Sequence, residues 1–103
     1  MENFNQKVYK IVKKIPFGKV STYGHISKAI GVKNRSRAVG YALNSVKEKG
    51  IPCHRVVNRK GELSGSLHFE TPTLMKELLL SEEIEFINEK VNLKKHLWIP
   101  NKD

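Results

Sequence analysis

The chain has 103 residues, and its 19 Lys and Arg residues against 10 Asp and Glu residues give a formal net charge of +9. No apolar run approaches membrane-spanning length, and the start MENFNQKVYK lacks the hydrophobic stretch of a signal peptide. We therefore expect one cytoplasmic domain over residues 1–103, nucleoid-associated if the source is bacterial. The charge favours polyanions such as DNA, RNA or anionic membrane surfaces, although a merely solvated basic surface would explain it as well.

The first third of the chain predicts two helices. Apolar side chains between residues 4 and 15 recur at helical spacing, and Pro16 ends that pattern. A second, shorter helix is predicted within residues 20–31, where Ser21 or Thr22 can cap its start and a glycine ends it.

A third helix is predicted over residues 36–50, after a connection of four residues. Two helices joined by a tight, glycine-containing turn are typical of a helix-turn-helix, although any small helical protein can contain such a pair. The stretch HRVVNRKGEL, residues 54–63, then predicts a small β-hairpin around a glycine turn.

The remainder predicts a loop, a helix and a tail. A fourth helix should begin with Thr71 as cap and Pro72 at its first position. Two short extended pieces anchored by Trp98 are expected after it. The predicted fold class is mainly α: a winged helix-turn-helix-like DNA-binding domain with a small β-hairpin.

The only cysteine, Cys53, lies between Pro52 and His54. A lone intracellular cysteine is most often an inert buried thiol. His54 and Arg55 can, however, lower the pKa of a thiol and make it a nucleophile. A metal site fails on spacing, because the histidines are scattered and a second cysteine is absent. We expect neither a metal nor a cofactor.

The string IPCHRVV around this thiol resembles the active-site signature of the O6-alkylguanine-DNA alkyltransferases, the methylated-DNA–protein-cysteine methyltransferases. The resemblance covers nearly the whole chain, and its further motifs are GKVSTYGHISKAIG, SRAVGYAL and LMKELLLSEE. It implies a winged helix-turn-helix-like fold that takes an alkyl group from O6 of a flipped guanine in duplex DNA. The transfer is irreversible, so each molecule acts once.

The resemblance also implies roles for individual residues. Cys53 would be the acceptor, His54 would deprotonate it through a water, and Glu83 would orient that histidine. Tyr23 would help to rotate the nucleotide and serve the leaving guanine, while Arg37 would enter the duplex in place of the lesion. Transfer to a thiolate makes chemical sense, because displacement at an alkyl carbon needs a soft, ionised nucleophile. The base must first leave the stack.

Further contacts are implied for the pocket and for the DNA. Val56 and Ser66 would line the lesion pocket. Small residues allow a helix to approach the DNA backbone closely, although ordinary helix packing would explain them too. The implied DNA contacts are Ser36, Ala38, Gly40, Lys33 and Asn34, and the lysines expected near phosphates also include Lys28, Lys47 and Lys49.

The sequence departs from the family pattern at three places. The family's Asn-Pro pair is missing from the shorter segment NSVKEKGIP, and its Tyr-Ser-Gly-Gly loop is replaced by SGSLHFETP. Ile84 stands where the family has a glycine after the catalytic glutamate. The compact length and the tail VNLKKHLWIP look more like the alkyltransferase-like proteins, which typically have Trp in place of Cys53. Those proteins bind alkylated guanine without repairing it and flag it for nucleotide excision repair.

Three functions follow as hypotheses. The leading one is a monomeric, single-turnover methyltransferase whose partner is double-stranded DNA containing O6-alkylguanine, without a membrane partner. The second is a damage sensor that recruits nucleotide excision repair proteins. The third is a winged-helix transcription regulator, which would bind one operator sequence and would leave Cys53, His54 and Glu83 without a role.

Overall fold

The computed structural model describes residues 2–46 and 48–100, so that Lys47 lies outside the described residues. Its helices are α1 (Phe4–Val12), α2 (Tyr23–Ile30), α3 (Ser36–Asn44), α4 (Leu74–Ser81) and α5 (Leu93–His96), with short 3-10 turns η1 (Cys53–Arg55) and η2 (Ser66–His68). Its strands are β1 (Ser21–Thr22), β2 (Val56–Val57), β3 (Phe86–Ile87) and β4 (Lys90–Val91). This confirms the predicted mainly helical class. Within the described residues, no helix is long and apolar enough to cross a membrane.

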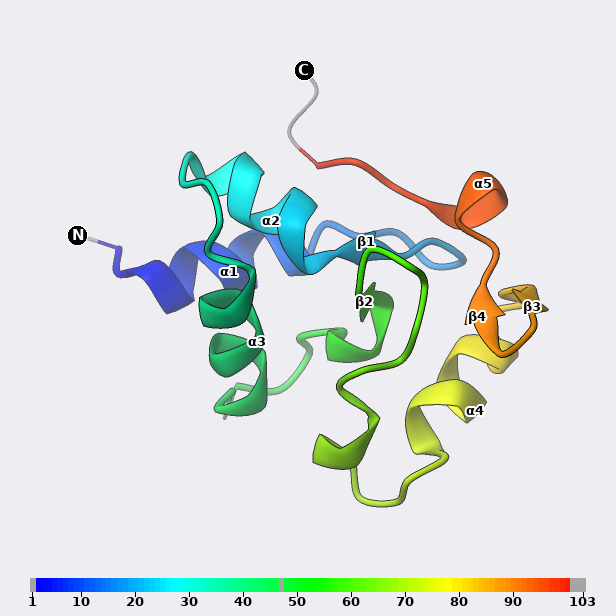
Figure 1. Ribbon diagram of the computed structural model, residues 1–103. Coiled ribbons are helices and arrows are strands. Elements are labelled where there is room, and N and C mark those ends of the chain that lie inside the picture. Colours follow the sequence, from blue (N-terminus) through cyan, green and yellow to red (C-terminus); the bar gives the residue numbers. More distant parts are fainter. Residues whose placement is uncertain (1, 47, 101–103) are drawn as a thin grey trace.

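The first half of the chain is a bundle of three helices. α1, α2 and α3 pack against one another on one side of the molecule (Figure 1). Asn3 and Gln6 form a reciprocal capping box at the start of α1, and the Thr22 hydroxyl caps α2 by accepting a hydrogen bond from the His25 N–H. Gly31 ends α2 with a left-handed φ of 100°. The predicted helix-turn-helix is confirmed as the pair α2 and α3.

Two helix boundaries differ from the predicted ones. α3 ends at Asn44 rather than at Gly50, and side-chain hydroxyls bond the carbonyls of its last turn: Tyr9 donates to the Ala42 carbonyl at 2.7 Å and Ser45 to the Tyr41 carbonyl at 3.0 Å. Serine hydrogen bonds of this kind compete with a continued helix. α4 begins at Leu74, after Thr73 as N-cap, and not at Pro72.

The predicted hairpin over residues 54–63 is wrong. β2 pairs in parallel with β1, which places Ser21 beside Val56 and Thr22 beside Val57. The Asn58 side chain closes the following turn by accepting a hydrogen bond of 2.9 Å from the Glu62 N–H, but no strand returns beside β2. The antiparallel pair is β3 with β4, within the predicted extended tail.

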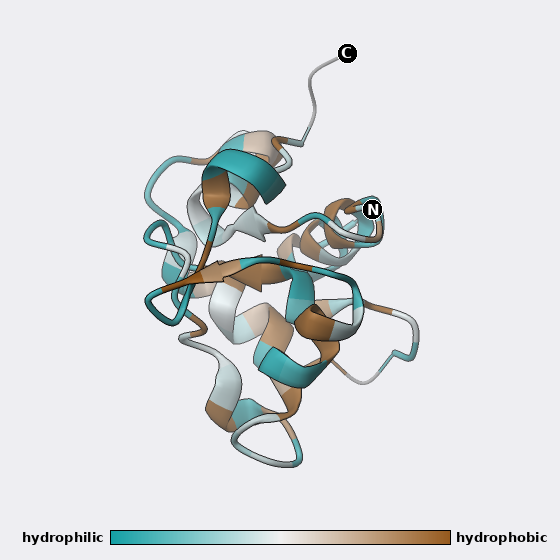
Figure 2. Cartoon of the chain, turned by 90° about the vertical axis from the view of Figure 1, so that its right-hand side faces the viewer, coloured by the Kyte–Doolittle hydropathy of each residue, from teal (hydrophilic) through white to brown (hydrophobic). Residues whose placement is uncertain are grey.

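Two hydrophobic clusters meet at the short parallel sheet. Val56 packs with the three helices of the first half, whereas Val57 packs with Met75, Leu79 and Val91 in the second half. Neighbouring residues of a strand face opposite sides, so β2 contributes one valine to each cluster. Hydrophobic and hydrophilic residues alternate along the helices in Figure 2, as one-sided packing requires.

Candidate active site

Cys53 is held by a tight turn between the two halves. Pro52 has φ −78° and ψ 69°, and the Cys53 N–H donates a hydrogen bond of 2.7 Å to the Ile51 carbonyl. These values are those of an inverse γ-turn, for which the fixed φ of proline is well suited. The half-buried thiol lies 3.9 Å from the carbonyl oxygen of Leu43, at the edge of the first cluster.

The next residue, His54, makes a hydrogen bond of 2.7 Å between its Nε2 and Oε2 of Glu82. A carboxylate can only accept, so this contact places a proton on Nε2 and leaves Nδ1 as the ring nitrogen without one in the neutral form. The predicted partner, Glu83, is wrong: its side chain is exposed, whereas Glu82 is buried.

The helix end explains this shift of one residue. α4 stops at Ser81, and Glu83 adopts a left-handed φ of 64°, a conformation that favours glycine. The glycine that the family pattern places after its catalytic glutamate therefore corresponds to Glu83, and Ile84 is a buried core residue. On a helix continued past Ser81, both glutamates would fall on the face of Met75 and Leu79, so the hydrophobic spacing alone could not separate them.

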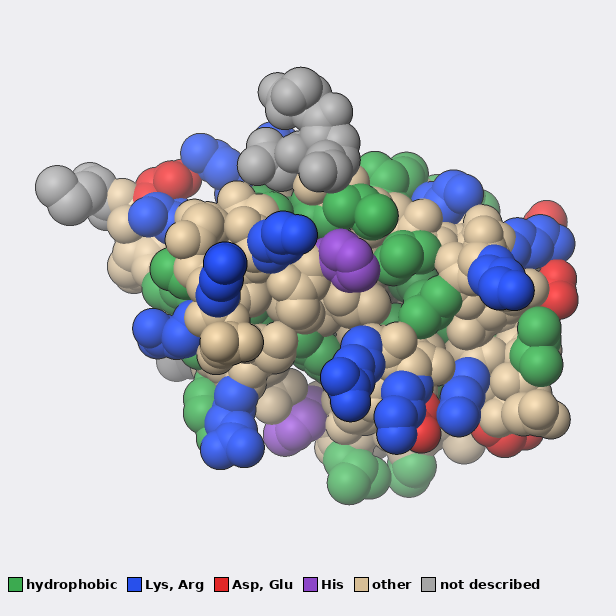
Figure 3. Space-filling view, turned by 45° about the horizontal axis from the view of Figure 1, so that its top comes forward, with side chains coloured by type: hydrophobic (Ala, Val, Ile, Leu, Met, Phe, Trp, Pro, Cys, Tyr) green, Lys and Arg blue, Asp and Glu red, His purple; other side chains and the backbone are tan. Residues whose placement is uncertain are grey.

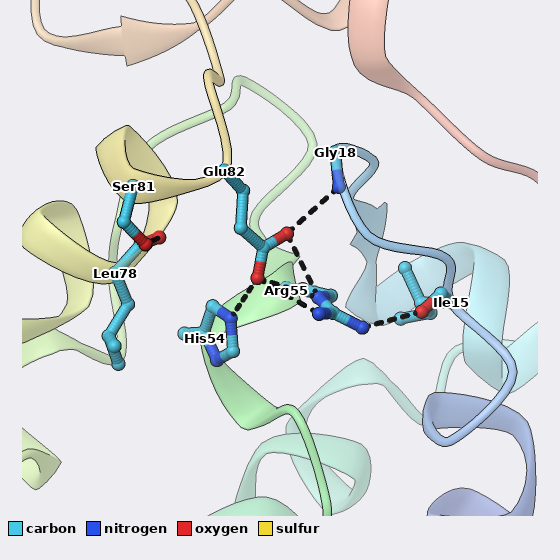
Figure 4. A network of polar contacts seen from close by, with 7 residues as sticks. All are labelled: Ile15, Gly18, His54, Arg55, Leu78, Ser81 and Glu82. Carbon is cyan, nitrogen blue, oxygen red and sulfur yellow. Dashed lines mark hydrogen bonds and ion pairs between the residues drawn. The ribbon is translucent and has the colours of Figure 1, made fainter.

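Arg55 links Glu82 to the first half of the chain through hydrogen bonds (Figure 4). Its guanidinium contacts Oε2 of Glu82 at 3.0 Å and donates a further hydrogen bond of 2.8 Å to the Ile15 carbonyl. The Gly18 N–H donates to Oε1 of Glu82 at 2.9 Å. Burial raises the pKa of Glu82, but the hydrogen bonds from Arg55, Gly18 and His54 outweigh it and hold the pKa below its usual value. Glu82 is therefore a charged support for His54.

A cavity of about 330 Å³ lies beside the thiol. Its lining includes Cys53, His54, Tyr23, Asn44, Gly65, His68 and Phe69. No role is predicted from the sequence for Gly65, His68 or Phe69, which belong to the atypical loop SGSLHFETP. A Cβ atom at Gly65 would lie 3.1 Å from the Tyr23 hydroxyl oxygen, so glycine is what lets this loop approach the phenol closely.

The predicted pocket residues Val56 and Ser66 are not in the lining of this cavity. Val56 is fully buried, because its strand turns it toward the three-helix cluster. The backbone N–H of Ser66 is already used in a hydrogen bond of 3.1 Å to the Leu63 carbonyl. Both assignments are therefore corrected.

A second hollow of about 320 Å³ shares Tyr23, Asn44 and His68 with the first. It is lined further by the predicted DNA-contact residues Arg37, Ser36 and Gly40, and by Ser64 and the exposed Tyr41. Tyr23 thus stands between the thiol and the open face of α3. Ala38 is half-buried and lies outside both linings.

Lys33 and Asn34 lie at the start of α3. With Lys28, Gly24 and Ser36 they line a third, shallow hollow, beside a helix N-terminus that lacks a side-chain cap. Uncapped N–H groups and lysines are well suited to phosphate oxygens. The face in Figure 3 carries many Lys and Arg side chains and few acidic ones.

Burial shifts the pKa values of the Cys53 and Tyr23 side chains. Burial raises the pKa of the Cys53 thiol, so the predicted lowering is wrong. The guanidinium of Arg55, expected beside the thiol, instead contacts Glu82 and the Ile15 carbonyl. Burial also raises the pKa of Tyr23, which keeps its phenol protonated and able to donate. Among the residues that the structure describes, no three His, Cys, Asp or Glu side chains converge as metal ligands.

Comparisons with known proteins agree with this geometry. Residues 3–84 match the family model described as the DNA-binding domain of 6-O-methylguanine DNA methyltransferase. Alkyltransferase-like protein 1 of Schizosaccharomyces pombe is 36% identical over 97% of this chain and 98% of its own length. A methylated-DNA–protein-cysteine methyltransferase of Methanosarcina acetivorans is 42% identical over 78% of this chain, which spans 50% of that protein.

The fold comparison adds a structure solved with DNA. The crystal structure of the S. pombe alkyltransferase-like protein, in complex with damaged DNA containing O6-carboxymethylguanine, superposes with a TM-score of 0.83 and is 35% identical. The superposition covers 95% of this chain and 98% of the S. pombe chain. Sequence, fold and the position of the thiol therefore lead to one conclusion: the chain belongs to the 6-O-methylguanine DNA methyltransferase DNA-binding-domain family.

Proposed function

We propose that this chain binds duplex DNA containing O6-alkylguanine, turns the damaged base into the cavity beside Cys53 and accepts its alkyl group on the thiol. The observation that carries the proposal is the joint placement of Cys53, His54 and Tyr23 around one cavity, with Glu82 supporting the histidine. The hollow that contains Arg37 adjoins this cavity through Tyr23, which gives a base a short path from the face of α3.

The chemistry follows from the protonation states. Nδ1 of His54 takes the thiol proton, directly or through one water, and Glu82 stabilises the resulting imidazolium. The thiolate then forms a bond to the alkyl carbon, while the bond from that carbon to O6 breaks and its electron pair stays with guanine. Tyr23 donates a proton to the leaving base. Because burial raises the pKa of Cys53, the thiol stays protonated until the substrate is in place.

Binding to DNA draws on the surface around α3. Lys28, Lys33 and the uncapped start of α3 fit phosphate oxygens, and the exposed Arg37 can fill the stack that the flipped base leaves. Flipping costs a few kcal/mol, which such an inserted side chain offsets in part. The net charge of +9 favours this partner over a neutral ligand.

The decisive experiment is intact-protein mass spectrometry after incubation with a duplex that contains O6-methylguanine. We expect the gain of one methyl group on the peptide that holds Cys53, and no gain in Cys53→Ser, which should still bind the duplex. A native protein that binds the lesion without gaining mass would make it a damage sensor instead. Undiminished uptake by Cys53→Ser would remove the mechanism.

A neighbouring pair of substitutions tests the carboxylate assignment. Glu82→Gln should slow transfer by about 100-fold or more, because the imidazolium of His54 loses its counter-charge. Glu83→Gln has the same chemistry one residue further on and should leave the rate unchanged, since that side chain is exposed. The rate of transfer from free O6-benzylguanine measures both variants without involving DNA. Equal effects would contradict the role of Glu82.

Arg37→Ala separates base flipping from the chemistry. Transfer from duplex DNA should fall much more than transfer from free O6-benzylguanine, which needs no flipping. Equal slowing of both substrates would show that Arg37 supports the pocket rather than the duplex.

Damage sensing is the second candidate, and a specific observation favours it. The alkyltransferase-like relative matches 97% of this chain, whereas the methyltransferase relative matches 78% of it. A sensor would use the same cavity and the same α3 face but would leave Cys53 unmodified and hand the lesion to nucleotide excision repair proteins. The mass measurement decides between the two functions.

A further inference from the structure

The C-terminal segment, residues 85–100, lies beyond the part of the chain that the family model matches. It nevertheless pairs with the first half of the chain at Val20. The Val20 N–H donates to the His96 carbonyl at 3.0 Å, and the Trp98 N–H donates to the Val20 carbonyl at 2.7 Å. This backbone pairing brings α5 against the loop that contains Gly18.

The side chain of His96 is buried and makes two hydrogen bonds from its ring. Nε2 accepts from the Glu85 N–H at 2.9 Å, and Nδ1 contacts the Gly18 carbonyl at 3.1 Å. A carbonyl can only accept and an amide N–H can only donate. The ring is therefore neutral, with its proton on Nδ1.

Gly18 connects this histidine to the active site. Its carbonyl accepts from His96, while its N–H donates to Oε1 of Glu82, whose other oxygen contacts His54 at 2.7 Å. Gly18 has a left-handed φ of 82°, a conformation that glycine adopts readily. Hydrogen bonds on both of its flanking peptide groups hold the N–H in the direction of Glu82.

We propose that His96 is a positioning residue for the active site: through Gly18 it orients the Glu82 carboxylate and, with it, the ring of His54. The C-terminal segment would thereby help to position active-site side chains in addition to covering the hydrophobic core. Its effect on alkyl transfer rests on the proposed function, but its effect on Glu82 and His54 does not.

The test is an NMR titration of the DNA-free protein, following the Glu82 carboxyl carbon and the His54 ring nitrogens. His96→Phe keeps the ring volume and removes both hydrogen bonds. The Glu82 midpoint should move upward, because Gly18 no longer donates reliably to it, and the His54 ring should lose its fixed Nε2–H form. His96→Gln retains one donor and one acceptor and should restore both signals at least in part.

Val91→Ala is the matched control. It removes buried volume from the same C-terminal segment while leaving the Gly18 hydrogen bonds in place. An unchanged Glu82 midpoint in folded His96→Phe, or an equal shift in Val91→Ala, would overturn the proposal. Alkyl transfer from free O6-benzylguanine is measured alongside. If the native protein transferred no alkyl group, the proposed function would be wrong. The NMR titration would still test whether His96 positions Glu82 and His54.

Discussion

The two halves of this molecule are built in different ways. Residues 4–44 form three helices, of which α1 and α2 have side-chain caps, and Tyr23 of α2 and Arg37 of α3 line one hollow. Residues 53–98 contain short elements whose hydrogen bonds reach across the sequence, such as those that Glu82 and His96 form with Gly18. The comparison teaches that the proposed DNA face rests on local structure, whereas the proposed chemistry rests on long-range contacts.

The two halves are joined at several points. The parallel pair β1 and β2 places one valine in each cluster, and Arg55 spans from Ile15 to Glu82. We expect the halves to unfold together because these junctions are buried. The following predictions test that expectation, from the largest effect to the smallest.

Leu79→Ala should destabilise the whole chain, by about 3 kcal/mol, through lost burial and a residual cavity in the second cluster. Its neighbour Leu80 is 52% exposed, so Leu80→Ala should change stability by less than about 0.5 kcal/mol. Urea unfolding, followed by circular dichroism and by fluorescence of Trp98, which packs on the first cluster, measures both variants. Separate transitions for the two probes would show that the halves are independent.

Arg55→Ala should cost about 3 kcal/mol, because it leaves the buried Glu82 carboxylate without its main partner. Lys13→Ala is the exposed counterpart: it removes an ion pair to Glu48 and should cost less than about 1 kcal/mol. Thermal and urea unfolding supply the comparison. A similar loss of stability in Arg55→Ala and Lys13→Ala would mean that Arg55 does not join the halves.

Acid should weaken the second half through Glu82. Its native pKa is lowered from 4.5, so the unfolded chain binds the proton more readily in this range. The stability that this carboxylate contributes is complete above its unfolded pKa and is lost as the pH falls through its native pKa. Glu82→Gln should therefore flatten the stability curve below about pH 5.

Glu85→Gln is the matched control for the acid experiment. Glu85 also has a lowered pKa, through its hydrogen bond with Lys95, but its side chain is 45% exposed. Added salt should remove the contribution of Glu85 to the pH dependence of stability and leave the contribution of Glu82 largely unchanged. A salt-insensitive Glu85 together with a salt-sensitive Glu82 would contradict the different burial of the two groups.

Glu83→Gly should stabilise the chain by about 1 kcal/mol, because glycine relieves the left-handed backbone at this position. Glu83→Ala keeps the β-carbon and should bring no such gain. Chemical unfolding of the two variants gives the difference directly. Equal stabilities of Glu83→Gly and Glu83→Ala would mean that the backbone conformation of Glu83 carries no measurable strain.

The sequence by itself determined the helices of the first half, the cap of α2 and the family. Periodic apolar residues, Thr22 and Gly31 act over a few neighbours, so their pattern is readable without a structure. The motif around Cys53 is equally local, and the structure brings the thiol and His54 to one cavity. Even there, α3 ended early, at Asn44, where the hydroxyls of Tyr9 and Ser45 bond the carbonyls of the last turn.

Tertiary structure alone decided the rest. On a helix continued past Ser81, both Glu82 and Glu83 would fall on the face of Met75 and Leu79, and only the end of α4 and the left-handed turn select Glu82. β2 found its partner in β1 rather than in the residues that follow it, and this pairing buries Val56 and Val57 in different clusters. Burial likewise raised the pKa of Cys53, against the expectation drawn from its cationic neighbours, because desolvation disfavours the charged thiolate.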